Sequence, residues 1–66
     1  MLPNKTVTRV VNISRGIMYY TELSIADAVI DAAIREGLSE YDARQILEIS
    51  HILHFARCGH WMAYNV

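Results

Sequence analysis

All three histidines of the 66-residue chain, and its single cysteine, lie within ten residues of one another near the C-terminus. They are His51, His54, Cys58 and His60, and imidazole and thiolate are ligands that Zn²⁺ takes in proteins. On a helix, His51 and Cys58 would project in nearly the same direction. Structural zinc sites, however, draw ligand pairs from two separate segments with other spacings. We therefore expect no metal and interpret these groups as packing or solvated side chains.

Cysteine chemistry is the next candidate, because Cys58 could act as a nucleophile with His54 or His60 as its base. A position near a helix C-terminus would oppose this chemistry, since the negative end of the helix dipole raises a thiol pKa. The chain also has no glycine-rich phosphate loop and no GxSxG elbow. Asp27 and Asp31 are better interpreted as a solvated face than as an acid/base pair. We expect no enzymatic activity and no cofactor.

The charge balance argues against nucleic acid as the main partner. Six lysines and arginines stand against seven acids, for a net charge of -1, and affinity for phosphate depends on the number of cationic contacts. The best arrangement would use Lys5, Arg9 and Arg15 on phosphates, with Tyr19 or Tyr20 stacking on a base. A dimer would double these groups, so a dimeric nucleic-acid-binding regulator is the alternative function.

Localisation and domain number are constrained by length and by the start of the chain. A lone cysteine cannot form an internal disulfide, and small secreted domains normally carry several. No window approaches the eighteen apolar residues of a membrane span, and the N-terminus lacks the apolar segment of a signal peptide. We expect one cytoplasmic domain over residues 1–66 and no membrane partner.

The first half of the chain predicts a β-hairpin followed by a helix. β-Branched residues favour a strand over residues 5–13, and an apolar aromatic run favours a second over residues 17–22. Gly16 suits the tight connection between them. Alternation places Arg9 and Val11 on one face and Val10 on the other, but leaves open which face is buried.

Two helices are predicted over residues 25–36 and 40–57. Serine caps with an aspartate three residues later open both helices, and a glycine closes each. These residues are Ser24 with Asp27, Ser39 with Asp42, Gly37 and Gly59. The tail is too short for a further helix, and its aromatic content favours a strand over residues 60–65.

The expected fold class is therefore α+β, in the order ββααβ, with a three-stranded antiparallel sheet and both helices packed on one face. A mostly helical fold with an unstructured tail is the second choice.

Hydrophobic residues make up 53% of the chain, more than one small core can bury, and exposed apolar surface marks interaction sites. We expect a non-catalytic protein-interaction module, with another protein as partner and a homodimer. The small format resembles that of inhibitors from phages or mobile elements that block a host protein. The expected partner-binding residues are Tyr19, Tyr20, Trp61, Tyr64, Arg9 and Arg15. A second surface, for self-association, would use Ile52, Phe55 and His54.

Overall fold

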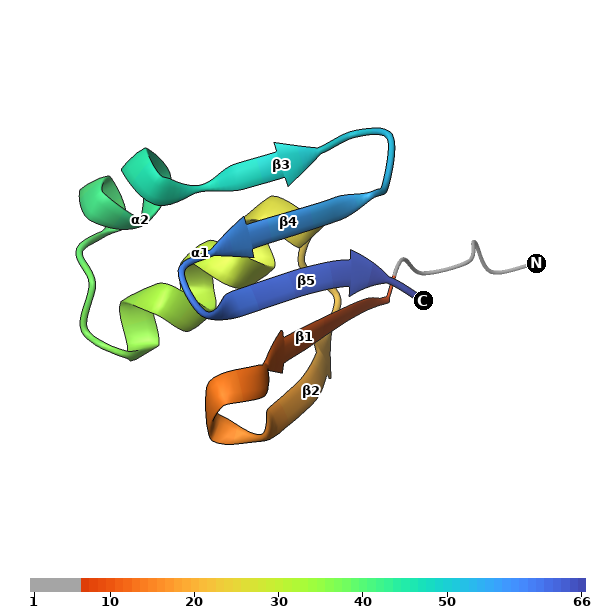
Figure 1. Cartoon of the computed structure of the whole chain (residues 1–66), viewed down its shortest axis with the longest axis horizontal. Coiled ribbons are helices and arrows are strands. Elements are labelled where there is room, and N and C mark those ends of the chain that lie inside the picture. Colours follow the sequence, from red (N-terminus) through yellow and green to blue (C-terminus); the bar gives the residue numbers. More distant parts are fainter. Residues whose placement is uncertain (1–6) are drawn as a thin grey trace.

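A computed structural model describes residues 7–66 and shows an α+β fold of two helices and a five-stranded antiparallel sheet (Figure 1). The order along the chain is ββ-αα-βββ. The strands are β1 (Thr8–Asn12), β2 (Ile17–Thr21), β3 (Glu48–Ser50), β4 (Phe55–Cys58) and β5 (Trp61–Asn65). The helices are α1 (Ile25–Arg35) and α2 (Glu40–Ile46), and a short 3₁₀ helix, η1 (Ile13–Arg15), joins β1 to β2.

The strands lie side by side in the order β2-β1-β5-β4-β3, and every neighbouring pair is antiparallel. The expectation of three strands is therefore wrong, although the three expected strands all exist. They are shorter than expected: residue 13 belongs to η1, residue 22 follows the end of β2, and β5 starts at Trp61. Residues 5 and 6 of the first expected strand lie outside the described residues.

The expected helix over residues 40–57 is the principal error. α2 ends at Ile46, and Leu47 adopts an extended conformation (φ -62°, ψ 129°) that turns the chain into β3. The following residues form a hairpin in which Ile49 of β3 is paired with Ala56 of β4. The turn between these strands places His54 at φ 52°. Pairing with β5 then fixes β4 inside the sheet, which outweighs the helical periodicity of the segment.

The two helix starts and the first turn confirm the local sequence signals. Ser24 Oγ accepts from the Asp27 amide at 3.2 Å, and Ser39 Oγ accepts from the Asp42 amide at 3.1 Å. Gly16 follows η1 with φ 66°, a left-handed conformation that favours glycine. The local signals therefore place these boundaries to within a residue or two.

α1 lies against one face of the sheet, behind β4 and β5 in Figure 1. Alanines meet at this contact, and small side chains let a helix backbone approach the strands closely. All of them are 3% exposed or less: Ala28, Ala32 and Ala33 of α1, Ala56 of β4 and Ala63 of β5. None of the helices in residues 7–66 has the length and apolar character needed to cross a membrane.

Strand alternation divides the sheet into two different faces. On β1, Thr8, Val10 and Asn12 are buried beneath the helix, at 0%, 0% and 1% exposure. Arg9 and Val11 point to the opposite face and are half-buried. The sequence left this choice of buried face undecided, and the structure places the helix on the Val10 side.

Candidate functional surface

The face of the sheet opposite α1, called the open face below, is the candidate functional surface. Strand register places ten side chains on it, and no helix of the described chain packs there. They are Arg9, Val11, Met18, Tyr20, Glu48, Ser50, Phe55, Arg57, Met62 and Tyr64. Met18 is 56% exposed and Tyr20 is 52% exposed. The face is thus rich in aromatic and thioether side chains, which interfaces favour.

Arg9 lies on this face between two tyrosines of the neighbouring strands. It is paired with Tyr20 of β2 on one side and with Tyr64 of β5 on the other. Its Nη1 donates to the Tyr64 hydroxyl at 3.2 Å, and its Nη2 donates to the Tyr20 hydroxyl at 3.0 Å. The guanidinium carbon is 5.3 Å from the Tyr20 ring centre and 5.5 Å from that of Tyr64, within cation–π range. We call these three residues the arginine clamp.

The arginine clamp holds a positive charge in place. The hydrogen bonds to Tyr64 and then Tyr20 raise the pKa of Arg9 above its ordinary value, so the side chain is always charged. Its Nε is buried without a hydrogen-bond partner in the described part of the chain. Because each tyrosine oxygen accepts from Arg9, each phenolic O–H is left to donate elsewhere. The clamp can therefore present donors and a charge to an anion.

No carboxylate of residues 7–66 forms an ion pair with Arg9. The ion pairs among these residues engage other arginines, namely Arg15 with Glu36, Arg35 with Asp31, and Arg44 with Glu40. Arg57, the second arginine of the open face, donates its Nε–H to the Gly59 carbonyl at 3.1 Å.

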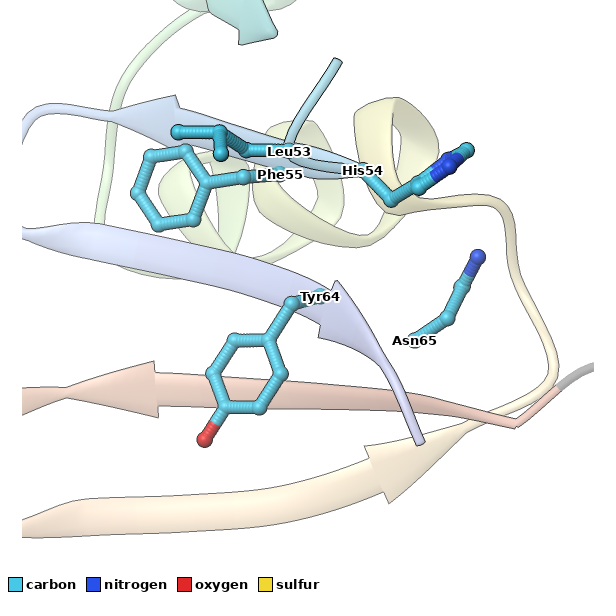
Figure 2. Close-up of a pocket in the computed structure, with 5 residues that line it drawn as sticks. All are labelled: Leu53, His54, Phe55, Tyr64 and Asn65. Atoms are coloured by element: carbon cyan, nitrogen blue, oxygen red, sulfur yellow. The ribbon is translucent and has the colours of Figure 1, made fainter. Parts of the chain in front are cut away.

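An apolar depression of about 670 Å³ adjoins the clamp where β4 and β5 lie together. It is lined by Leu53, His54, Phe55, Tyr64 and Asn65 (Figure 2). Figure 2 shows Leu53 beside the Phe55 ring, with Tyr64 on the neighbouring strand. The His54 side chain points away from Leu53 and Phe55. Since Tyr64 also belongs to the clamp, the charge and the apolar depression form one continuous surface.

The structure separates the six residues expected to bind a partner. Arg9, Tyr20 and Tyr64 come together as the clamp. Tyr19 and Trp61 lie on the helix-covered face instead, where their rings pack edge to face with centres 6.3 Å apart. Trp61 is only 6% exposed and belongs to the core of this fold. The sequence could not show this, because aromatic content does not reveal which side of a strand is covered.

Arg15 lies at the β1–β2 connection and pairs with Glu36, just after α1. The hydrogen bond from Arg15, followed by the influence of the Trp61 indole, lowers the pKa of the Glu36 carboxyl. This contact ties the hairpin to the helix. Arg15 is therefore occupied by an intramolecular ion pair, unlike Arg9.

The expected self-association residues lie at the β3–β4 turn and beside it. Ile52 is 90% exposed, and His54 is exposed on the same turn. Phe55 starts β4 and is half-buried on the open face. The three residues are therefore neighbours along a turn and not one stripe of a helix.

The histidine and cysteine cluster of the sequence is dispersed by the hairpin. His51 is exposed in the turn, and His60 follows Gly59 at the next turn, where its Nδ1 lies 3.3 Å from Ser14 Oγ. Cys58 is buried on the covered face, with Sγ 3.4 Å from the Ala43 carbonyl, and burial raises its thiol pKa. Within residues 7–66, no three histidine, cysteine or acidic side chains are grouped to hold a metal ion.

Sequence reasoning missed much of the open face. The expected partner-binding residues did not include Val11, Met18, Met62 or Arg57, and Leu53 was assigned to a helix. Residues two apart on a strand share a face, so Val11 lies on the face of Arg9 and Met18 on the face of Tyr20. Both could have been assigned to the open face once the buried side of β1 was known. Comparison with family models, curated proteins and solved structures finds no match to this chain.

Proposed function

We propose that this protein is a non-catalytic interaction module that binds another protein through its open face. In this proposal the arginine clamp receives a carboxylate of the partner, and the surrounding apolar side chains pack against apolar partner residues. The observation that carries the proposal is the fixed charge of Arg9, which has no acidic partner in the described chain and stands on an uncovered aromatic sheet face.

The clamp suits an interface for energetic reasons. Arginine and tyrosine are enriched among the residues that contribute most to binding, especially at the centre of an interface. Two hydrogen bonds and two rings already hold the guanidinium, so less conformational freedom is lost on binding. A partner carboxylate can accept charge-assisted hydrogen bonds, which are stronger than neutral ones.

A protein partner fits the open face better than a nucleic acid does. Only Arg9 and Arg57 carry positive charge on it, and Glu48 lies opposite Arg57 in the register. Two cations make a weak phosphate site, because affinity for nucleic acid grows with the number of phosphates that cations neutralise. Val11, Met18 and Met62 instead offer apolar area to a protein surface. An inhibitor that covers the working surface of a host protein is one role that such a face could perform.

Selection from a phage-displayed library of random peptides tests this function. Selected peptides are expected to contain Asp or Glu next to apolar residues. Arg9→Ala should weaken their binding by about tenfold or more. Arg44→Ala is the matched control, because it removes the same charge from an exposed position on α2, and it should leave binding unchanged.

Two results would overturn the proposal. One is a set of peptides bound equally by wild-type and folded Arg9→Ala protein. The other is tight binding of a single-stranded DNA or RNA oligomer that falls steeply with salt and requires Arg9, because that dependence identifies phosphate contacts. Circular dichroism of each variant establishes that its fold is retained.

A further inference from the structure

A second pocket lies where two chain connections meet at one end of the sheet. Asn12 of β1 is paired with Trp61 of β5, so η1, which follows β1, lies beside the turn between β4 and β5. Figure 1 shows both connections at the same end of the sheet. The pocket, called the turn pocket below, has a volume of about 240 Å³. It is lined by Ile13, Ser14, Arg57, Gly59, His60 and Met62.

Arg57 brings a positive charge to the turn pocket. Its Nε–H donates to the Gly59 carbonyl at 3.1 Å, which directs the guanidinium towards the β4–β5 turn. Its two Nη groups have no hydrogen-bond partner within residues 7–66. A guanidinium carries five N–H donors and does not lose its charge in proteins. The Nη donors are therefore left for a ligand.

His60 and Ser14 add a further donor from two other parts of the chain. His60 Nδ1 lies 3.3 Å from Ser14 Oγ. If the hydroxyl donates to Nδ1, the neutral imidazole carries its proton on Nε2 and can donate from there. If Nδ1 donates instead, the hydroxyl keeps its own proton to donate. Either tautomer therefore leaves one donor of this pair for a ligand.

No acidic side chain lines the turn pocket, although two lie near the residues that do. Glu48 is opposite Arg57 in the register of β3 and β4, but the two form no ion pair in the described chain. The pKa of Glu36 is lowered chiefly by Arg15, its ion-pair partner, and His60 contributes only a small part. The turn pocket thus combines a fixed positive charge with unused donors, which suits an anion.

We propose that the turn pocket binds the phosphoryl group of a small phosphate monoester. Arg57, His60 and Ser14 reach the pocket from β4, from the β4–β5 turn and from η1. A phosphoryl group presents three terminal oxygens to such donors, whereas a carboxylate presents two in one plane. Ile13 and Met62 supply an apolar wall for the organic part of the ester. At about 30 Å³ per water, the pocket corresponds to about eight water molecules, which limits it to a small ligand.

The turn pocket is separate from the arginine clamp and independent of the proposed function. Arg9 is paired with Tyr64, and Tyr64 with Phe55, so Arg57 lies two strands and two positions away from Arg9. Strand geometry makes this separation about 12 Å. Neither tyrosine of the clamp lines the turn pocket. A single phosphoryl group needs only local donors, unlike a nucleic acid, whose affinity depends on many phosphates.

Titration of the isotopically labelled full chain with phenyl phosphate, followed by nuclear magnetic resonance, tests the site. The amide signals of Ser14, Gly59 and His60 should shift together and saturate in the millimolar range. Arg57→Gln should weaken binding by about tenfold or more, because it removes hydrogen bonds from a charged donor. Arg44→Gln is the matched control, since it removes the same charge from an exposed position on α2, and should leave binding unchanged. The amide spectrum of each variant shows whether its fold is retained.

Two further probes identify the chemistry that is recognised. Benzoate keeps the ring but carries a carboxylate, and inorganic phosphate lacks the ring, so both should bind the turn pocket more weakly than phenyl phosphate. Arg9→Ala should leave phenyl phosphate binding unchanged, which separates this test from that of the proposed function. Shifts that never saturate, or binding that folded Arg57→Gln retains in full, would overturn the proposal. Equally tight binding of benzoate or of inorganic phosphate at the turn would overturn the assignment of a phosphate monoester.

Discussion

Arg9 donates a hydrogen bond of 3.2 Å to the hydroxyl of Tyr64, a residue 55 positions further along the chain. The contact joins β1 to β5 and so connects the first and last strands of the described chain. The same guanidinium lies 5.5 Å from the centre of the Tyr64 ring. One pair of residues therefore stabilises the sheet and fixes the charge that we assign to partner binding.

Tyr64→Phe removes the hydroxyl that accepts from Arg9 and keeps the aromatic ring. We expect a small loss in the free energy of unfolding, since one hydrogen bond to a solvent-accessible guanidinium is removed. Affinity for acidic peptides should fall as well, because Arg9 would be less firmly held. Tyr41→Phe is the control, as Tyr41 is 72% exposed on α2. Urea unfolding and peptide titration check both variants, and equal effects in the two would contradict this role of the hydroxyl.

Trp61→Ala is expected to destabilise the fold rather than to remove an exposed contact. The indole is 6% exposed and packs against Tyr19. Truncating a buried tryptophan costs about 3–5 kcal/mol, which can unfold a domain of this size. Trp61→Phe keeps an aromatic ring and should cost less. Urea unfolding followed by circular dichroism measures this, and an unchanged midpoint for Trp61→Ala would show that the ring is not part of the core.

The thiol of Cys58 should react slowly in the folded protein. It is 1% exposed, and burial raises its pKa, so little of the reactive thiolate forms near neutral pH. A thiol-specific chromogenic reagent should modify the urea-unfolded chain many times faster than the native one. Cys58→Ser gives the background rate. Equal rates in the two states would place the thiol at the surface.

The contact between Arg15 and Glu36 should make stability depend on pH in the acid range. The pKa of Glu36 is lower in the folded protein than its ordinary value, chiefly because Arg15 donates to the carboxylate. The stabilising effect of the contact is therefore fully present above the ordinary glutamate pKa of about 4. It is lost as the pH falls through the lower pKa that Glu36 has in the folded protein. Wild-type protein should be more stable than Glu36→Gln at pH 7, with a smaller difference at pH 3. A difference that stays constant with pH would refute the link.

Serine N-caps and a turn glycine allowed much of the first half of the fold to be predicted from the sequence. Ser24 and Ser39 bind the amides that their spacing indicates, and Gly16 has the positive φ expected of it. These signals are local, because each depends on residues within one helical turn. The presence of the β1–β2 hairpin and of the C-terminal strand also followed from local composition.

The β3–β4 hairpin was not predicted because its turn carries little local signal. Residues 51–54 contain no glycine, proline, asparagine or aspartate, and His54 takes the positive φ itself. The turn is held instead by Ser50, whose Oγ accepts from the Leu53 amide at 3.2 Å. Pairing of β4 with β5 depends on residues brought together by the fold, and helical periodicity gives no information about it.

The same error concealed part of the candidate site. With residues 55–57 assigned to a helix, Phe55 and Tyr64 had no reason to be neighbours, yet they are paired across β4 and β5. Arg9, Tyr20 and Tyr64 were all expected to bind a partner, but their meeting in one clamp depends on the register of three strands. The residue types therefore indicated which side chains could bind a partner. Their arrangement in one clamp could be known only from the order and register of the strands.

Mapping a bound acidic peptide by nuclear magnetic resonance tests the central claim most directly. The peptide would come from the phage selection, and the amide signals of the protein would be followed as it is added. We expect the largest shifts along β1, β2, β4 and β5, together with a shift of the Arg9 Nε–H signal that is absent in Arg9→Ala. Shifts confined to α1 and α2, with the Arg9 signal unmoved, would contradict the assignment of the open face as the binding surface.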